Sequence, residues 1–254
     1  HYSNGTVNPT PEVSLRNNPD LNTGFVWPFE LWMGAPLLFP PGEQYSYTTM
    51  GFNLAGAVIG AVYNDAYDLD LPPDQSFRDL VSKRIGKKAA PGLQPDYHWE
   101  DIGDRAKGYK ITSSGTVVED SDTDVSWKLP GGGYISTVSD MAGFCRALMT
   151  NNPLDKESKN TLFTRQNLSD GTPTYYGLGF YVSYWGDKIY HSGSQEKARS
   201  YLVFFPDDEL CIVAVANTQG YSDKYPVSPK ELTEGVEDII RERLADGDPI
   251  IITR

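Results

Sequence analysis

Cationic side chains, cysteine and histidine are all scarce in this 254-residue chain, and each shortage argues against a class of function. The chain has 22 lysines and arginines against 34 aspartates and glutamates, which gives a formal charge of −12 at pH 7. Nucleic-acid backbones and anionic membranes are bound by concentrated positive charge, so we expect neither as a partner. No apolar run reaches the roughly 20 residues of a membrane-spanning helix, so no span is expected in this chain.

The few cysteines and histidines predict no metal site. Cys145 and Cys211 are the only cysteines, too few for a disulfide scaffold or a zinc site, and we expect both to be buried free thiols. His1 stands at the terminus and His98 in a polar loop, which leaves His191 with no second histidine at ligand spacing. No glycine-rich phosphate loop precedes a predicted helix. The sequence therefore predicts neither a metal nor a cofactor.

Hydrophobic patterning predicts helices early in the chain and antiparallel strands late. Residues 51–63 are nearly all apolar and rich in small side chains, a pattern typical of a helix packed closely on all sides. Thr137 and Asp140 form a capping box at the start of another helix. Helices are predicted over residues 51–63, 76–85, 138–149 and 229–244, and strands over residues 176–185, 200–205 and 211–216. This order indicates an α+β fold.

The first 40 residues contain several prolines and asparagines but no periodic segment longer than a turn. A compact domain rarely opens with so long an irregular stretch. We therefore expect this chain to be a piece of a longer protein that was cut or trimmed upstream.

Four motifs, in a fixed order, carry a family resemblance. Residues 41–56 read PGEQYSYTTMGFNLAG, which resembles the second motif of the serine β-lactamase-like hydrolases. Three further matches follow in that family's order: RAKGY at 105–109, KLPGGGYISTVSDM at 128–141, and YGLGF at 176–180 followed by HSG at 191–193. The resemblance, to penicillin-binding-protein-like and class C β-lactamase-like enzymes, extends over about residues 36–217.

The resemblance implies a β-lactamase/transpeptidase-like fold, in which helices and a helical subdomain flank an antiparallel sheet. It implies a single domain, residues 1–254, that is incomplete at its N-terminus. About residues 1–130 would be mainly loop and helix, and about residues 131–254 would hold a helix, the strands and the C-terminal helix. It is also compatible with a secreted or periplasmic protein, although no residue assigns a compartment.

In that family a serine of Ser-x-x-Lys attacks a carbonyl and forms an acyl-enzyme. By motif match, Tyr47 is the proton-shuttling tyrosine and His191 stands at the Lys/His position, so both are catalytic candidates. The resemblance implies four substrate-binding residues, the last through its backbone N–H in the oxyanion hole: Thr49, Ser192, Gly193 and Ser194. The expected partner is a small-molecule or peptide-like substrate: an ester, an amide or a β-lactam.

The nucleophile is where the chain departs from the family. Its only Ser-x-x-Lys runs from Ser194 to Lys197, after His191, whereas the family's pair lies upstream on the first turn of a buried helix. We therefore reject Ser194 as the nucleophile. The catalytic serine is expected in a missing N-terminal segment of the same protein, and residues 1–254 alone are expected to be inactive. The alternative is a non-catalytic scaffold or binding protein, which Thr49 favours because the family has asparagine there.

Overall fold

The computed structural model describes residues 36–97, 100–120, 125–150, 154–218 and 227–246. The chain divides into two compact units that alternate along the sequence. The first holds the described parts of His1–Gly103, Thr123–Lys156 and Arg165–Thr174; the second holds those of Asp104–Asp122, Glu157–Thr164 and Tyr175–Arg254. Most of the irregular N-terminal stretch, with His1, and also His98 lie outside the described residues.

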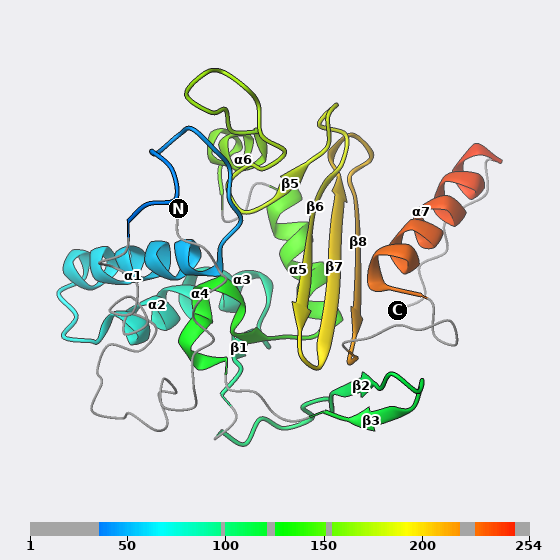
Figure 1. The fold of residues 1–254 in the computed structure, drawn as a ribbon, viewed down its shortest axis with the longest axis horizontal. Helices are drawn as coiled ribbons and strands as arrows, with labels where there is room; N and C mark the ends of the chain where they lie inside the picture. Colours follow the sequence, from blue (N-terminus) through cyan, green and yellow to red (C-terminus); the bar gives the residue numbers. More distant parts are fainter. Residues whose placement is uncertain (1–35, 98–99, 121–124, 151–153, 219–226, 247–254) are drawn as a thin grey trace. The chain divides into compact units, whose positions relative to one another are not determined.

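The first unit is mainly helical (Figure 1). Its only strands in the described residues, β1 and β4, form a two-residue antiparallel pair. The predicted helix over 76–85 is confirmed, but after α2 the chain continues in a π-helical turn, η3. In chain order the elements are α1 (Thr49–Ala66), α2 (Pro73–Val81), η3 (Ser82–Gly86), α3 (Lys87–Ala89), β1 (Gln94–Pro95), η4 (Ser126–Lys128), α4 (Leu129–Gly132), β4 (Tyr134–Ile135) and α5 (Val138–Met149).

Within the described part of the chain, helix α1 buries one face, which differs from the predicted helix packed on all sides. Its buried residues recur at helical spacing: Met50, Asn53, Gly56, Gly60 and Tyr63. The opposite face carries no charge over four turns, and Val58 and Val62 on it are 56% and 63% exposed. A uniformly apolar sequence does not show which side of a helix will pack against a neighbour; among the described residues it is the side that carries the glycines.

The buried face of α1 meets α4 at unusually short range. A Cβ on Gly56 would lie 2.2 Å from Cγ of Pro130, so only glycine admits this approach. Beside it lies a small core of Tyr97 and Leu129, against which Phe77 packs. This packing fixes the start of α1 relative to residues 127–131.

Helix α5 begins where its capping signal predicts. The Thr137 hydroxyl oxygen accepts from the Asp140 backbone N–H at 3.1 Å and donates to Oδ2 of Asp140 at 2.9 Å. The helix then buries Cys145 and Leu148. The local capping pattern was therefore sufficient to place this helix.

The second unit is built on a four-stranded antiparallel sheet in the order β5-β6-β7-β8 (Figure 1). The predicted strands over 200–205 and 211–216 are confirmed as β7 and β8. The predicted strand over 176–185 is wrong except for two residues, because Gly179 at φ +100° turns the chain back before β5. The elements are β2 (Tyr109–Ile111), β3 (Val117–Glu119), α6 (Lys156–Phe163), β5 (Tyr181–Val182), β6 (Ile189–Gln195), β7 (Ala198–Phe205), η5 (Pro206–Asp208), β8 (Leu210–Ala216) and α7 (Pro229–Ala245).

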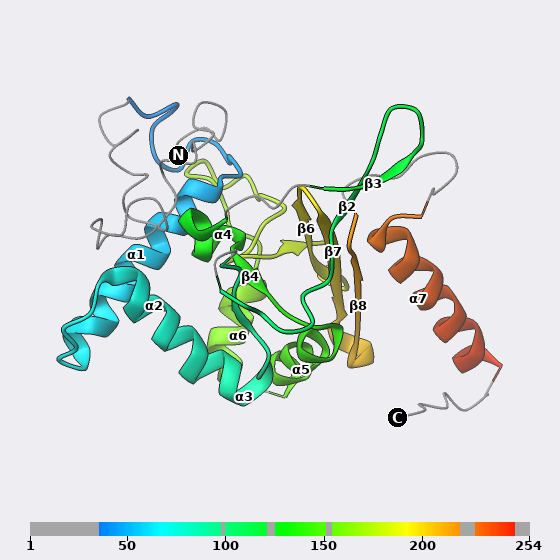
Figure 2. The ribbon, with the colours of Figure 1, turned by 90° about the horizontal axis from the view of Figure 1, so that it is seen from below.

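Helix α7 covers one face of this sheet, as Figure 2 shows from below. A capping box of Ser228 and Glu231 starts it, and Ile240 packs against a core that includes Tyr201 and Phe205. The second unit therefore places its core between α7 and the β7–β8 hairpin. Helices with a purely antiparallel sheet confirm the α+β prediction.

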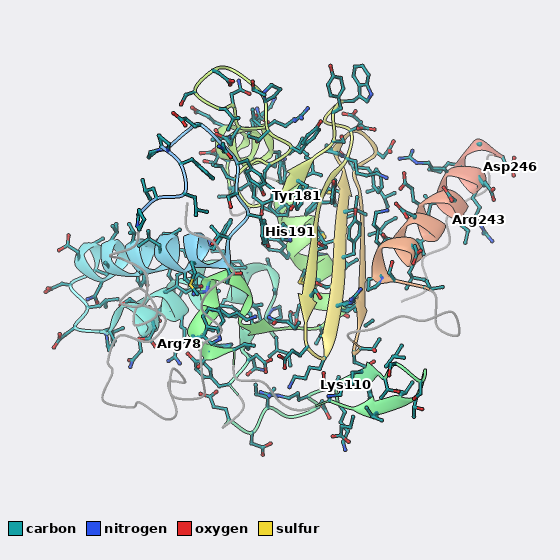
Figure 3. The ribbon with its side chains drawn as sticks, in the orientation of Figure 1. Arg78, Lys110, Tyr181, His191, Arg243 and Asp246 are labelled. Carbon is teal, nitrogen blue, oxygen red and sulfur yellow. The ribbon has the colours of Figure 1, made fainter. Side chains whose placement is uncertain are left out.

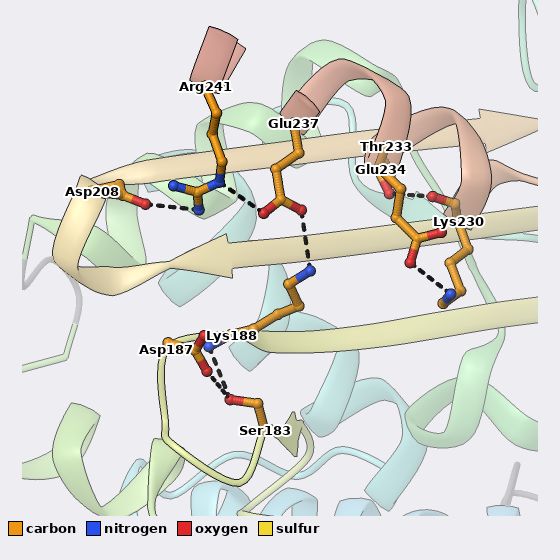
Figure 4. A network of polar contacts seen from close by, with 9 residues as sticks. All are labelled: Ser183, Asp187, Lys188, Asp208, Lys230, Thr233, Glu234, Glu237 and Arg241. Carbon is orange, nitrogen blue, oxygen red and sulfur yellow. Dashed lines mark hydrogen bonds and ion pairs between the residues drawn. The ribbon is translucent and has the colours of Figure 1, made fainter. Parts of the chain in front are cut away.

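A polar network ties α7 to the sheet (Figure 4). Glu237 accepts from Lys188 Nζ at 3.1 Å and from Arg241 Nε at 3.0 Å, and Arg241 also reaches Asp208 at 3.0 Å. Both cations lie over the Phe205 ring, each 5.1 Å from its centroid. Because the Glu237 side chain is only 14% exposed, salt screens its pair with Lys188 less than the half-exposed pair of Arg241 with Asp208.

The prediction of two free thiols is also wrong, because Cys145 and Cys211 are both disulfide-bonded. Disulfide formation depends on the separation of Cα atoms in the fold, which the distance along the sequence does not show. Among the described residues, no helix is long and apolar enough to cross a membrane. The same part of the chain holds no cluster of acidic, histidine or cysteine side chains suited to a metal ion.

Candidate active site

Tyr47 lies in the loop that leads into α1, two residues before the first helical residue, Thr49. Its side chain is 44% exposed, whereas the adjacent N-cap residue Thr48 is buried. At the other end of the loop, the Gly42 carbonyl accepts from the Ser169 N–H at 2.9 Å, and Gly42 has φ +89°. The loop is thus anchored on both sides, with the tyrosine between the anchors accessible to solvent.

The first turn of α1 is held by α4 and η4. A Cβ on Gly131 would lie 2.5 Å from Cγ2 of Thr49, so the glycine turn permits this contact. Asn53, one turn later, is fully buried and donates from Nδ2 to the Trp127 carbonyl at 3.0 Å. Thr49 therefore occupies a fixed position at the helix start, with its side chain half-buried.

Strand β6 has an open edge, which we define as the β5 side of residues 192–194. β5 pairs only with Ile189 and Tyr190, while β7 pairs with the whole of β6. No other strand among the described residues joins the sheet on that side. An extended chain could therefore pair with β6 there.

The backbone groups of two serines point to this open edge. The Ser183 N–H donates to the Lys188 carbonyl at 2.9 Å, which makes them a hydrogen-bonded pair across the β5–β6 turn. Hydrogen-bonded pairs alternate along an antiparallel ladder, so Tyr190 also points its N–H and C=O toward β5. The same alternation directs the N–H and C=O of Ser192 and Ser194 to the open edge.

The side chains of these serines lie elsewhere. Ser192 is directly opposite Tyr201, and opposite residues share a face of the sheet, so its hydroxyl is on the α7 side. Gly193 is opposite Ser200, and a Cβ on Gly193 would lie 2.3 Å from the Ser200 Oγ. The open edge therefore presents mainly backbone, with a glycine whose added Cβ would require the Ser200 hydroxyl to move.

Both ring nitrogens of His191 are hydrogen-bonded. Nδ1 lies 2.7 Å from the Ser192 carbonyl oxygen, and Nε2 lies 2.9 Å from the Tyr176 hydroxyl. The His191 and Tyr181 rings are neighbours, with centroids 5.7 Å apart (Figure 3). Burial lowers the pKa of His191 below its ordinary 6.5, and the hydrogen bond to the Ser192 backbone opposes this only in part. The imidazole is therefore neutral at pH 7.

We expect this neutral histidine to make the protein less stable as the pH falls. Below pH 6.5 an unfolded chain protonates His191 and the folded chain does not, so unfolding takes up a proton. The stabilisation that neutral His191 gives the folded protein is fully present above pH 6.5 and is lost as the pH falls through the lowered pKa of His191. The free energy of unfolding of the full-length protein should fall more steeply between pH 7 and 5 than that of His191→Gln. Equal slopes would contradict the lowered pKa.

The structure distributes the six predicted site residues over the two units. Tyr47 and Thr49 belong to the first unit, at the entry to α1. The other four are consecutive on β6 in the second unit: His191, Ser192, Gly193 and Ser194.

The Ser-x-x-Lys at 194–197 does not have the geometry of a catalytic pair. Ser194 is on strand β6, and Lys197 is in the turn between β6 and β7, where its aliphatic stem packs against Gly108. A Lys one turn behind a Ser requires a helix, and there is none at this position. The location favours the rejection of Ser194 as the nucleophile.

Sequence reasoning missed two residues that support the site. Tyr176 belongs to the recognised YGLGF motif, but nothing in the pattern shows that its hydroxyl meets His191. Asn53 is a polar residue in an apolar run, and an amide in such a run is a sign of a buried hydrogen bond, here to the Trp127 carbonyl.

The sequence profile described as Beta-lactamase matches residues 28–233. Protein flp of Staphylococcus aureus is 25% identical over 189 residues, which cover 73% of this chain and 36% of flp. A penicillin-binding protein from Bacillus halodurans has a similar structure, with a TM-score of 0.66 and 21% identity over 85% of this chain and 63% of that one. The D-amino acid amidase of Ochrobactrum anthropi also has a similar structure, with a TM-score of 0.58 and 15% identity over 85% of this chain and 63% of that one. The β-lactamase/transpeptidase-like fold is thereby confirmed. The chain spans little more than a third of the length of flp.

Proposed function

Because this chain belongs to the Beta-lactamase family of serine hydrolases, we propose that it supplies the tyrosine and the substrate-binding strand of an enzyme that cleaves an ester or a peptide-like amide through an acyl-enzyme. The nucleophilic Ser-x-x-Lys lies outside residues 1–254. In this proposal the chain is the greater part of one domain that is incomplete at its N-terminus.

The open edge of β6 is the observation that carries the proposal. Ser192 and Ser194 direct backbone N–H groups away from β7, where a carbonyl of an extended substrate can accept them. The Ser194 N–H is the donor for the oxyanion, three residues after an uncharged His191. The fold shared with a D-amino acid amidase supports an amide or ester as the substrate.

The reaction needs a group that transfers a proton, and the side chain of Tyr47 is exposed enough for a substrate to reach its hydroxyl. The serine oxygen forms a bond to the carbonyl carbon and gives up its proton, which reaches the leaving nitrogen or oxygen through the Tyr47 hydroxyl as the C–N or C–O bond breaks. Water then attacks the acyl-enzyme and returns a proton by the same route. Thr49, with one hydroxyl, offers the substrate a single polar contact.

A decisive test is covalent labelling of the full-length protein with a fluorophosphonate. We expect a labelled serine in a Ser-x-x-Lys outside this chain, no label on residues 1–254 alone, and no effect of Ser194→Ala on labelling. Label on Ser194 would contradict the assignment of the nucleophile. An unlabelled full-length protein that still binds peptide-like ligands would favour a non-catalytic scaffold.

We expect the enzyme to prefer neutral esters or amides over penicillins. A neutral His191 provides no fixed positive charge for the carboxylate of a β-lactam, and the chain's charge of −12 opposes anions. A hydrogen bond without charge is worth about half of a charge-assisted one, so the preference should be up to about tenfold. The measurement compares kcat/KM for p-nitrophenyl butyrate and nitrocefin, each relative to its uncatalysed hydrolysis. A preference for nitrocefin would identify a β-lactamase.

A further inference from the structure

We propose that Tyr176 is a positioning residue that holds His191 as a neutral imidazole with its proton on Nδ1, beside the open edge of β6. This inference rests on the proposed function for the role of His191, but its geometry lies entirely within the second unit.

The hydrogen-bond partners decide the tautomer. The Ser192 carbonyl oxygen can only accept, so His191 Nδ1, 2.7 Å away, carries the proton. In a neutral imidazole the other nitrogen is then an acceptor, and the Tyr176 hydroxyl, 2.9 Å from Nε2, donates to it. Burial of the ring disfavours the imidazolium that would reverse this second bond.

The chain before β5 is folded so that Tyr176 can reach the ring. Gly179, at φ +100°, reverses the chain, and the Gly177 N–H donates to the Phe180 carbonyl at 2.8 Å. Tyr176 and Tyr181 then form an isolated antiparallel β-bridge. The Tyr176 ring is 7% exposed and packs edge-on against Tyr181, with centroids 4.7 Å apart. A hydroxyl on a ring held in this way has little freedom to leave His191.

Bonds at both nitrogens fix the plane of the imidazole relative to the backbone. One bond ends on Ser192, which presents its N–H to the open edge two residues from Ser194. Loss of the Tyr176 hydroxyl removes the donor to Nε2 of the half-buried His191 ring. We therefore expect Tyr176→Phe to lower kcat of the full-length enzyme about tenfold, the cost of one misplaced hydrogen bond.

The test is nitrogen-15 NMR of histidine side chains in the full-length protein. We expect His191 to show the neutral Nδ1–H pattern at pH 7 and the Tyr176 hydroxyl proton to be protected from exchange. In Tyr176→Phe the Nε2 resonance should move to the position of a nitrogen without a donor, while Nδ1 stays protonated. Tyr181→Phe is the matched control, because its ring also neighbours His191 and the structure gives it no hydrogen bond to the imidazole.

Three results would overturn the proposal: a His191 that is charged or protonated on Nε2 in the wild-type protein, an Nε2 resonance that Tyr176→Phe does not move, or an equal shift in Tyr181→Phe. If Tyr176→Phe does not fold, the wild-type tautomer and the exchange of the Tyr176 hydroxyl proton decide alone. A protein that shows the expected spectra but hydrolyses no ester or amide contradicts the proposed function and leaves the pairing of Tyr176 with His191 intact.

Discussion

Replacing Tyr47 by phenylalanine in the full-length protein is expected to lower kcat by about 10²–10⁴-fold, the range for loss of a positioned acid–base group. The hydroxyl is the only group removed, and the side chain is 44% exposed, so the free energy of unfolding should change little. Steady-state kinetics with p-nitrophenyl butyrate and a urea denaturation curve measure the two effects separately.

Tyr45→Phe is the matched control for this substitution. Tyr45 lies two residues earlier in the same loop and is similarly exposed, at 43%, but it stands outside the Tyr-x-Thr position of the motif. We expect kcat close to that of the unmodified enzyme. If Tyr47→Phe also keeps a near-normal kcat, Tyr47 is a structural residue and the scaffold alternative gains support.

Gly56→Ala is expected to destabilise the full-length protein by about 1–3 kcal/mol, the range typical of overpacking. The added Cβ would lie 2.2 Å from Cγ and 2.5 Å from Cβ of Pro130, and a proline ring has few ways to move aside. Because α1 must shift away from α4, Thr49 loses its packing contact with Gly131, and kcat should fall as well. Thermal or urea denaturation measures the first effect.

Gly235→Ala is the matched control, and its expected effect has the opposite sign. Gly235 is exposed in the middle of α7, and nothing lies within 4 Å of its added Cβ. Alanine should stabilise the protein by roughly 0.5–1 kcal/mol, because glycine loses more backbone entropy in a helix. Destabilisation by both substitutions would show that backbone entropy and Cβ space do not govern these sites.

Elements with local signals were predictable from the sequence. The capping interaction of Thr137 with Asp140 is a property of four consecutive residues, and α5 begins there. The strands β7 and β8 also follow from short β-rich runs around a turn. In each case the interactions that form the element lie within the segment itself.

Features that depend on distant residues were not predictable. The apolar run of α1 could not show which face packs against the other described residues. Whether Cys145 and Cys211 form disulfides depends on distances in the fold, which the sequence does not give. The strand expected over 176–185 fails at Gly179, whose left-handed backbone is not distinguishable in sequence from a glycine in a strand.

The candidate site divides in the same way. Motif order alone nominates Tyr47 and the four consecutive β6 residues as candidates, because each motif is a contiguous stretch of chain. The partner of His191 across the β5–β6 region required the fold, since Tyr176 is 15 residues away and reaches the ring only through the turn at Gly179.

The open edge of β6 also bears on how the protein behaves at high concentration. Any strand edge that can accept a substrate can accept an edge strand of another copy, which is a route to aggregation. Here the edge is short, Glu196 and Lys197 place charges at its end, and the His191 imidazole already occupies the Ser192 carbonyl. A foreign strand would have to share the Ser192 carbonyl with the Nδ1–H of His191, so the histidine that serves the site also weakens edge-to-edge pairing between copies of the chain.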